Sequence, residues 1–578
     1  MQNILLVYPE FPPSYWGFKF ALKFVGKKSA MPPLGLLTVA GLFPERYRLR
    51  LVDMNVQALT DEDLRWADLV FTSTMIVQRD SLRSMVKRCK EMGVPVVAGG
   101  PHPTSFHQEL DDVDYLVLDE VEEVLPEFLR DLESGRARRV YRAERRPEMD
   151  LAPLPRFDLI RLEDYGSMAL QFSRGCPFDC EFCDITKLFG RSSRTKTPEQ
   201  MLTEFDQLYR LGWRGNLFLV DDNFIGNKRE ALSLLPLIAQ WQQERSYPFS
   251  LFTEASVNLA KLDPLMDAMV EAGFSMVFLG IETPNPEALL KTKKKQNTKK
   301  GEEGFLFNAV RAIQQKGMEV TGGFILGLDG DGPGVFDSQI EFIQEAGIPM
   351  AMTGLLSALK GTDLYERLKG EGRLLEESSG NNVSVTLNFQ TEMDRQVLVD
   401  GYKKVLTTLY DKNLRNYFRR CETLLDHLTA TRHFVRPVGK TEVSAALRSL
   451  FLQLFSRQGP CYGRFLLRVL FRYPRMLPEA FRLGIMGYHF EKITSHQIAV
   501  HDFKLFLEAQ LEALGKRFAE YAKISNQGTE DARAYVQEIL DQVHTRYDSI
   551  HHDFRYAVAE AFESFERSIR NQLNPDNS

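Results

Sequence analysis

The amino-acid sequence predicts an α/β fold in three parts: a doubly wound parallel sheet, a partial barrel of six βα units, and an all-helical C-terminal extension. Two observations predict it. Up to residue 375, short apolar runs alternate with amphipathic segments, which is typical of parallel sheets covered by helices. Beyond residue 376 no strand pattern persists, and residues 395–575 have the periodicity of helices. The expected boundaries are 1–132, a linker at 133–164, 165–375 and 376–578.

The N-terminal part reads as a flavodoxin-like sheet. Its strands are expected at 4–8, 47–52, 69–71, 94–98 and 115–118, with helices or turns at 33–43, 80–92, 104–110 and 121–132. Ligands of such sheets bind beyond the carboxyl ends of the strands. The first strand is followed by YPEFPP instead of a G-x-G-x-x-G motif, so a nicotinamide or flavin dinucleotide is not expected.

Two other strand ends carry residues suited to a ligand. The third strand leads into Ser73, Thr74 and Met75, and the fourth into Gly99 and Gly100 with His102 two positions later. Paired glycines let a ligand approach the backbone closely. His102 taken alone fits a local hydrogen bond as readily as a ligand contact.

The second part reads as six βα units that follow a charged, proline-containing linker. The strands are expected at 168–172, 217–220, 249–252, 276–280, 320–326 and 350–355. A capping box, Thr197-Pro198-Glu199-Gln200, predicts the start of the first long helix. Catalytic groups of such barrels lie at the carboxyl ends of the strands.

Residues 174–183 read RGCPFDCEFC, so Cys176, Cys180 and Cys183 have the spacing C-x3-C-x2-C. Three thiolates on one short loop can hold three irons of a [4Fe-4S] cluster. No fourth cysteine follows nearby, which leaves the fourth iron open to another ligand. The alternative, structural zinc, requires four ligands, and no histidine lies between His107 and His427.

Polar residues recur at the predicted ends of successive barrel strands. Asp222 and Asn223 follow the second strand, Glu254 the third and Glu282 the fourth, and Gly323 lies on the fifth. Taken singly, each carboxylate could cap a helix or form a structural ion pair. Their repetition favours a shared ligand site.

The cysteine motif resembles the signature of radical S-adenosylmethionine (SAM) enzymes. Together with PPLGLLTVA at 32–40 and VDDNFIGNK at 220–228, it resembles the cobalamin-dependent radical SAM methyltransferases, in the group that includes the hopanoid C-2 methylases. The resemblance covers roughly residues 1–420 and weakens in the helical tail.

This resemblance implies that the open iron binds SAM and that its reductive cleavage gives a 5'-deoxyadenosyl radical. It implies that Asp222 accepts from the SAM ammonium, that Glu282 accepts from the ribose, and that Phe182 and Gly323 face the adenine. Asn223 and Glu254 would complete that site.

The resemblance also implies cobalamin in the N-terminal domain. Its contacts would be Ser73, Thr74, Met75, Gly99, Gly100 and His102. No histidine has an aspartate two residues before it, so the D-x-H-x-x-G motif is absent. The cofactor would sit base-off, with its lower face near residues 73–75. The alternative is a domain without a ligand, or one that holds another nucleotide.

The expected function is radical methylation of an unactivated carbon of an unidentified small molecule or lipid, with polyprenoids among the candidates. A reductant such as flavodoxin or ferredoxin would supply electrons. Two alternatives stay open: a cobalamin-dependent rearrangement, cyclisation or ring contraction without methyl transfer, and a noncatalytic iron-sulfur scaffold or sensor. A tRNA-modifying methylthiotransferase would usually add a second cysteine trio and an RNA-binding tail, and neither is visible.

Composition limits the partners. Net charge is −6, which argues against nonspecific binding of nucleic acid. Six cysteines are too few for a disulfide scaffold, and the remaining three, Cys89, Cys421 and Cys461, are expected to be packing residues or free thiols. No run of about 18 uncharged apolar residues occurs, so a cytoplasmic protein is expected.

Two basic stretches stand out against this acidic background. Residues 412–482 hold 14 Lys/Arg against 4 Asp/Glu. Their amphipathic pattern suits a peripheral contact with an anionic membrane, and the alternative is a helical cap whose arginines pair within the fold. The lysine-rich run at 291–300 is expected to be a solvated loop.

Overall fold

The computed structural model describes residues 3–299, 302, 304–381, 385–428, 439–521 and 528–573. Lys300 and residues 429–438 of the two basic stretches lie outside the described residues. Contacts between residues divide the chain into two compact units, 1–490 and 491–578. The boundaries expected at 132, 165 and 376 stay predictions.

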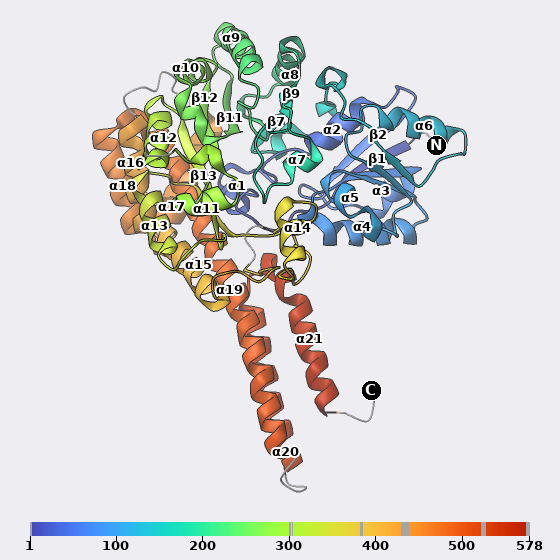
Figure 1. Ribbon diagram of the computed structural model, residues 1–578, viewed down its shortest axis with the longest axis vertical. Coiled ribbons are helices and arrows are strands. Elements are labelled where there is room, and N and C mark those ends of the chain that lie inside the picture. The colour runs from blue at the N-terminus through green and yellow to red at the C-terminus, as the bar shows by residue number, and fades with distance from the viewer. Residues whose placement is uncertain are drawn as a thin grey trace. The chain divides into compact units, whose positions relative to one another are not determined.

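The first sheet has six parallel strands in the order β2-β1-β3-β4-β5-β6. It lies in the blue, N-terminal part of the ribbon (Figure 1). They are β1 (Asn3–Tyr8), β2 (Arg48–Asp53), β3 (Leu69–Ser73), β4 (Val96–Gly99), β5 (Tyr115–Leu118) and β6 (Val140–Arg142). The five predicted strands are all present, and the doubly wound parallel sheet is confirmed. The sixth, β6, lies in the stretch assigned to the linker. Its three residues sit among charged ones and are too short to show apolar alternation.

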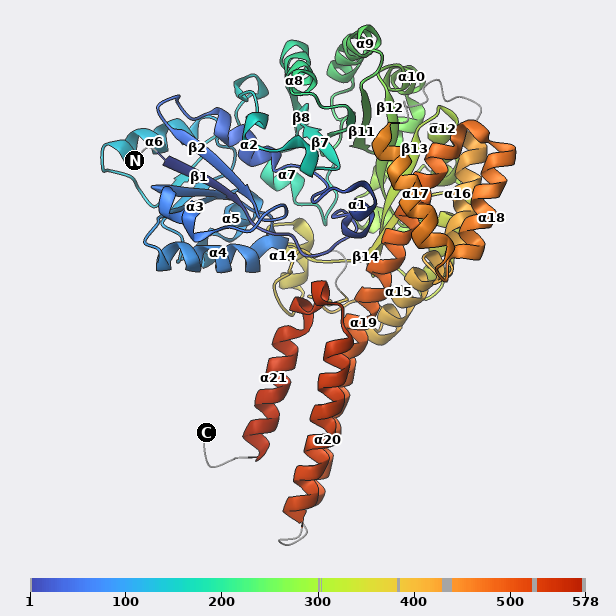
Figure 2. The same cartoon turned by 180° about the vertical axis from the view of Figure 1, so that it is seen from behind.

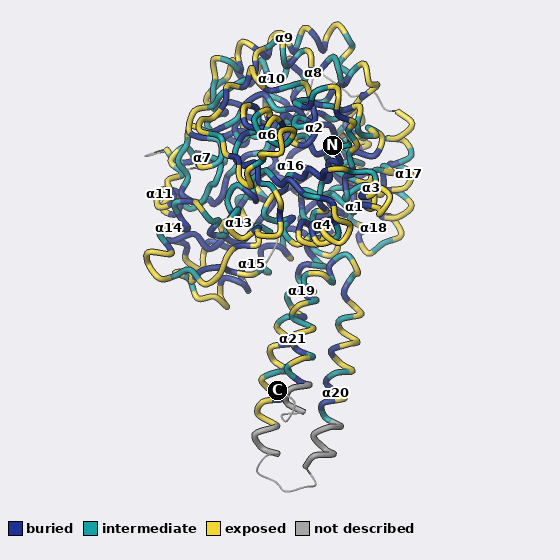
Figure 3. The backbone as a smooth tube through the Cα atoms, turned by 90° about the vertical axis from the view of Figure 1, so that its right-hand side faces the viewer, coloured by how far each residue is buried: buried dark blue, intermediate teal, exposed yellow. Residues whose placement is uncertain are grey.

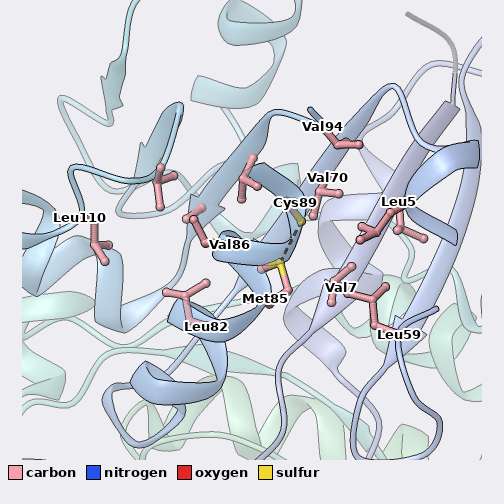
Figure 4. Packing of buried hydrophobic residues seen from close by; sticks show 14 of the residues in the cluster. Leu5, Val7, Leu59, Val70, Leu82, Met85, Val86, Cys89, Val94 and Leu110 are labelled. Atoms are coloured by element: carbon pink, nitrogen blue, oxygen red, sulfur yellow. Dashed lines mark hydrogen bonds between the residues drawn. The ribbon is translucent and has the colours of Figure 1, made fainter. Parts of the chain in front are cut away.

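Helices cover both faces of this sheet because successive strand residues point to opposite sides. Leu5 and Val7 face α3 (Asp61–Trp66) and α4 (Arg79–Glu91), where they pack with Leu82, Met85 and Cys89 (Figure 4). The Cys89 sulfur lies 3.5 Å from the Met85 sulfur and is fully buried. Cys89 is therefore a packing residue.

The alternate strand residues build the opposite layer. Ile4 and Leu6 pack against Leu36 of α2 (Leu34–Gly41) and Phe128 of α6 (Val124–Glu133). Two short helices complete this part of the chain, α1 (Lys19–Val25) and α5 (Pro101–Phe106).

The second sheet has six parallel strands in the order β14-β13-β12-β11-β10-β7. They are β7 (Ser167–Leu170), β10 (Gly215–Leu219), β11 (Phe249–Ala255), β12 (Phe274–Glu282), β13 (Glu319–Leu326) and β14 (Ala351–Leu355). No pairing joins the two edge strands, β7 and β14, among the described residues. The partial (β/α)6 barrel is thereby confirmed, with every strand at its predicted place.

The barrel helices are α8 (Pro198–Arg210), α9 (Lys228–Glu244), α10 (Asp263–Glu271), α11 (Pro286–Lys291), α12 (Phe305–Gln315) and α13 (Val335–Glu345). The predicted capping box precedes α8: the Thr197 hydroxyl accepts from Gln200 N at 3.2 Å, and Thr197 N donates to Gln200 Oε1 at 2.9 Å.

Helices follow the barrel, as predicted. The first unit holds α14 (Asp363–Gly370), α15 (Arg395–Leu409), α16 (Arg415–Leu428), α17 (Lys440–Leu454), α18 (Gly459–Arg472) and the start of α19 (Leu477–Tyr521). The second unit holds the rest of α19 with α20 (Gly528–Ser549) and α21 (Tyr556–Leu573), whose Tyr547 and Phe562 rings stack at 4.2 Å. Among the described residues, no helix is both long and apolar enough to cross a membrane.

Arg420 fastens α16 to the barrel. Its side chain is fully buried and donates to the carbonyls of Ile348, Leu409 and Pro349 at 3.0, 2.7 and 3.2 Å. We expect Arg420→Met to lower the free energy of unfolding by about 3 kcal/mol, because three buried acceptors lose a charged donor. Urea denaturation measures the change. Arg419→Met, at an exposed neighbouring position, is the control, and equal effects of the two would contradict the account.

Candidate active site

The cysteine loop starts from a short hairpin. Strand β8 (Ser173–Arg174) pairs antiparallel with β9 (Arg194–Thr195), and α7 (Ile185–Leu188) lies between them. Gly175 has a φ of +94°, and a Cβ there would lie 2.6 Å from the Ser192 carbonyl oxygen. Only glycine fits this turn, which delivers Cys176 to the start of the loop.

The donor set of the loop is three thiols, and all three cysteines are partly exposed. A structural zinc site takes four ligands, whereas three thiolates on one loop can hold three irons of a [4Fe-4S] cluster. The side chains that contact the Cys176 and Cys180 sulfurs are the amides of Asn223 and Gln296, which donate to sulfur and add no thiolate or imidazole. The donor set therefore fits the iron-sulfur cluster.

Two amides and a cation surround the thiols. Asn223 Nδ2 donates to Cys176 Sγ at 3.9 Å, and Gln296 Nε2 donates to Cys180 Sγ at 3.3 Å. Burial raises the pKa of Cys183, and the Lys294 ammonium partly opposes that rise. Such donors stabilise negative charge on sulfur.

Lys294 corrects the expectation of a solvated loop at 291–300. Its Nζ lies 2.6 Å from Glu282 Oε1, and the two side chains are only 13% and 9% exposed. Burial alone lowers the pKa of Lys294, but Glu282 and the thiolates of Cys180 and Cys183 raise it above its usual value. The expectation was wrong here because the run begins at the last residue of α11 and the segment that follows folds back onto the end of β12.

Asn297 anchors the same segment. Its side-chain amide donates to the carbonyls of Gly280 and Ile281 at 2.8 and 3.0 Å. Glu282 itself has a φ of +66°, an unusual conformation for a side chain other than glycine or asparagine. The end of β12 is thus held from two sides, with the Glu282 carboxylate beside the cysteine loop.

The end of β10 fastens the cysteine loop to the barrel. Asp221 is buried and accepts from the backbone of Phe172 and Ser173 at 2.8 and 2.9 Å. Asp222 Oδ2 accepts from Gly175 N at 3.1 Å. Burial raises the pKa of Asp222 to about 6.

Asn223 links the loop to the next strand end. While its amide faces Cys176, its Oδ1 accepts from Ser256 N at 3.2 Å. Its side chain therefore holds the loop in place from within the barrel.

Glu254, at the end of β11, offers an unused carboxylate. Its side chain accepts no hydrogen bond from any described residue. Burial, followed by the charges of Asp222 and Asp221, raises its pKa to about 8. A buried carboxyl group whose pKa is raised by a neighbouring carboxylate suits a cationic ligand. The ammonium group of SAM has that charge.

A cavity of about 250 Å³ opens at the barrel's strand ends. Its walls include Phe182, Glu282 and Gly323, and a Cβ at Gly323 would lie 2.9 Å from the Phe278 ring. The other lining side chains are largely apolar, and they include Tyr15, Trp16, Phe278, Phe324, Met352 and Leu355. Tyr15 and Trp16 were not predicted as site residues, and they reach the barrel cavity from a segment near the N-terminus.

A second cavity of about 250 Å³ lies at the strand ends of the first sheet. Ser73, Gly99 and Gly100 line it, with Leu34, Val39, Phe71, Val117 and Leu125 among its apolar residues. Gly100 has a φ of +91°, and a Cβ there would lie 2.5 Å from Ser73 Oγ. Glycine thus keeps this edge open for a ligand.

The other three predicted cobalamin contacts lie outside that lining. Met75 is 51% exposed. His102 is buried, and its backbone N donates to Thr74 O at 2.9 Å. Burial, then Arg79 and Arg83, lower the His102 pKa to about 4, so its ring is neutral.

A buried charge network joins the two sheets beside the cysteines. Arg174 Nη1 lies 2.8 Å from Glu120 and 2.7 Å from Glu122, and Arg194 Nη2 lies 2.6 Å from Glu120. These four side chains are between 2% and 12% exposed. Glu120, Glu122 and Arg174 also line the cavity of the first sheet. The network therefore fixes the cysteine loop relative to that cavity.

Glu120→Gln tests the network. We expect it to lower the free energy of unfolding by about 3 kcal/mol, because two buried arginines lose a charged partner. The iron retained after gel filtration should fall as well. Glu123→Gln is the matched control, since its partner Arg145 is 78% exposed and such surface pairs contribute about 0–1 kcal/mol. Unchanged stability and iron content of Glu120→Gln would contradict the proposed coupling.

Three families match successive parts of the chain. Residues 27–129 match the B12 binding domain, 170–343 the radical SAM superfamily, and 362–501 a domain of unknown function (DUF4070). The fold also resembles a solved cobalamin-dependent S-adenosylmethionine radical enzyme, OxsB with aqua-cobalamin bound. The TM-score is 0.56 at 14% identity, over 86% of this chain and 80% of that one.

Two relatives share most of their length with this chain. An uncharacterized methyltransferase of Synechocystis sp. is 46% identical over 426 residues, 73% of this chain and 78% of that protein. The hopanoid C-2 methylase of Rhodopseudomonas palustris is 35% identical over 436 residues, 75% and 81%. The cofactors are accordingly a [4Fe-4S] cluster, SAM and cobalamin. The chain belongs to the cobalamin-dependent radical SAM methyltransferases, in the group that includes the hopanoid C-2 methylase.

Proposed function

We propose that the protein methylates an unactivated carbon of an apolar substrate, with Cys176, Cys180 and Cys183 as the protein ligands of the cluster. One observation carries the proposal: the cysteine loop contributes to both cavities. Arg174, two residues before Cys176, lines the cavity of the first sheet, and Phe182, just before Cys183, lines the barrel cavity. A group held by this loop would therefore stand between them.

SAM would bind at the barrel's strand ends. Asp222 and Glu254 supply carboxylates for its ammonium, and Glu282 supplies an acceptor for its ribose. Asn223, the residue after Asp222, holds the cysteine loop in place through its contacts with Cys176 and Ser256. Phe182 and Gly323 provide the wall and the open backbone for adenine. Lys294 keeps the Glu282 carboxylate in place.

Cobalamin would bind at the first sheet, with part of the molecule in the cavity beside Ser73, Gly99 and Gly100. The apolar lining suits an uncharged part of the cofactor. Thr74, Met75 and His102 stay in the proposal as neighbours on the same strand ends. The buried position of His102, outside the cavity lining, supports a base-off mode without a histidine ligand.

When bound, these groups would supply an adenosyl radical and a transferable methyl group. The protein's own contribution is to exclude water and to orient the acceptor carbon. Trp16, Phe278, Phe324, Met352 and Leu355 give the barrel cavity an apolar wall, which favours a lipid or polyprenoid acceptor. The hopanoid methylase relative supports this choice. A flavodoxin or ferredoxin would provide the electrons.

Product analysis tests the proposal. The anaerobically reconstituted enzyme is incubated with SAM, cobalamin, a strong reductant and a bacterial lipid extract. We expect 5'-deoxyadenosine, S-adenosylhomocysteine and a lipid heavier by one methylene, with the last absent when cobalamin is omitted. 5'-Deoxyadenosine together with a lipid of unchanged composition would indicate rearrangement, and absence of SAM cleavage would indicate a scaffold.

A further inference from the structure

Helices α17 and α18 expose an unusual amount of apolar surface. Phe451, Phe455 and Phe471 are 72%, 85% and 84% exposed, and Leu447 and Leu467 are 62% and 57% exposed. Both helices lie on the outer side of the first unit (Figure 2), and exposed positions recur along them (Figure 3). Contiguous exposed apolar patches mark interaction sites.

The exposed residues follow a helical stripe. Val443, Leu447 and Phe451 of α17 and Phe455, the residue just after it, recur at intervals of four, which places them along one face. The Phe451 and Phe455 rings contact each other at 6.0 Å between centroids. The opposite face carries Ala445, Ser449 and Gln453, which are buried against the rest of the unit. The apolar stripe therefore stays exposed although the opposite face of the helix is packed against the unit.

The segment that carries this surface is also rich in positive charge. Residues 440–475 hold seven Lys/Arg and one Asp/Glu, in a chain of net charge −6. Arg468 and Arg472 pair with Glu422 and Asp426 of α16. This agrees in part with the expectation of a cap whose arginines pair internally.

Three further arginines are exposed. Arg457, Arg464 and Arg475 form no ion pair with the described residues. They remain available to an anionic partner.

We propose that the α17–α18 pair docks the enzyme on an anionic lipid bilayer. Exposed phenylalanine and leucine side chains would enter the acyl region, and the arginines would contact the headgroups, as in interfacial helices. A second copy of the chain is the poorer occupant, because a two-fold symmetric contact would bring these arginines close to their equivalents. An anionic bilayer is complementary to both properties of the surface, since its acyl chains match the apolar side chains and its headgroups match the arginines.

The docking surface is connected to the barrel cavity. Ala21 and Phe24 of α1 pack with Ala445 of α17. The segment just before α1 supplies Tyr15 and Trp16 to the cavity wall. The inference rests on the proposed function only in naming the bilayer as the source of the substrate, since the docking itself needs no particular reaction.

Vesicle sedimentation tests the docking with the full chain. Vesicles of phosphatidylcholine alone are compared with vesicles containing phosphatidylglycerol, at low and high salt. We expect binding to the anionic vesicles that weakens with salt. The triple variant Phe451→Ser, Phe455→Ser, Phe471→Ser should bind about tenfold more weakly. The triple variant Arg457→Gln, Arg464→Gln, Arg475→Gln should lose the preference for anionic lipid.

Leu232→Ser with Leu237→Ser is the matched control, since both leucines are exposed on α9, at 42% and 38%. It should bind like the wild type. Equal binding of the phenylalanine variant and the wild type would overturn the inference. So would a wild-type dimer that this variant converts to a monomer. The phenylalanine variant should still form 5'-deoxyadenosine, so loss of docking and failure of the proposed reaction are distinguishable.

Discussion

Cys183→Ser is expected to abolish reductive cleavage of SAM. The side chain is one of three thiols on the loop, and a serine hydroxyl at this position is a poor ligand for iron. Loss of a group that merely supports a metal ligand already costs about 10–100-fold in affinity or activity. We therefore expect more than a 100-fold loss of 5'-deoxyadenosine, together with loss of the cluster's visible absorption. Chromatography of the nucleoside product and iron analysis measure the two effects.

Cys461→Ser provides the comparison. Cys461 is also a partly exposed free thiol, but it lies on α18. Its replacement should leave both the absorption and the product unchanged. If Cys183→Ser kept a full complement of iron and normal cleavage, Cys183 would not be a cluster ligand and the assignment would fail.

Glu282→Gln is expected to have the second large effect. It leaves the buried Lys294 ammonium without its carboxylate, which costs about 3–5 kcal/mol of unfolding free energy. Lys294→Met should lower the unfolding free energy by a similar amount, because it leaves the buried Glu282 carboxylate without its ammonium partner. The double variant restores a neutral pair, so its stability should return to within about 1 kcal/mol of the wild type.

The double variant separates structure from ligand binding. It removes the charged acceptor that is expected to bind the ribose of SAM. Such a contact contributes about 1.5–3 kcal/mol, so the SAM dissociation constant should rise roughly 10–100-fold. Denaturation gives the stability, and calorimetric titration of SAM into the oxidised, reconstituted protein gives the affinity. Wild-type affinity in the double variant would show that Glu282 serves only the fold.

The strands were predictable because the sequences of buried parallel strands are short, continuous apolar runs. All six barrel strands and five of the six strands in the first sheet follow that pattern. The sixth, β6, was missed because its side chains alternate between exposed and buried over only three residues. Helix α1 was missed because KFALKFV is too short to show periodicity against the prolines and aromatics before it.

The candidate site was predictable only where the residues that form it lie close together in the sequence. The cysteine loop and the carboxylates at the ends of β10, β11 and β12 are local features of the sequence. Lys294 and Gln296 reach the thiols because the segment after α11 folds back onto β12, a contact that no spacing rule encodes. A lysine-rich run usually predicts a solvent-exposed loop. Lys294 is buried instead, because its ammonium pairs with the buried Glu282 carboxylate.

Cavities were the least predictable feature. Tyr15 and Trp16 line the barrel cavity from a segment far away in sequence, and Arg174 lines the cavity of the other sheet. Such walls are assembled from several elements, so they depend on the tertiary arrangement alone. Conversely, Thr74, Met75 and His102 follow the same strand ends as the cavity residues, yet they are not part of its lining.

The central claim is that three thiolates from one loop leave one iron free to bind SAM. The most direct measurement is electron paramagnetic resonance of the anaerobically reduced enzyme before and after addition of SAM, with nuclear coupling read from SAM labelled with ¹⁵N at its amino group. The account predicts that SAM changes the spectrum and that the labelled nitrogen couples to the cluster. An identical spectrum with and without SAM, and no coupling to the label, would contradict it.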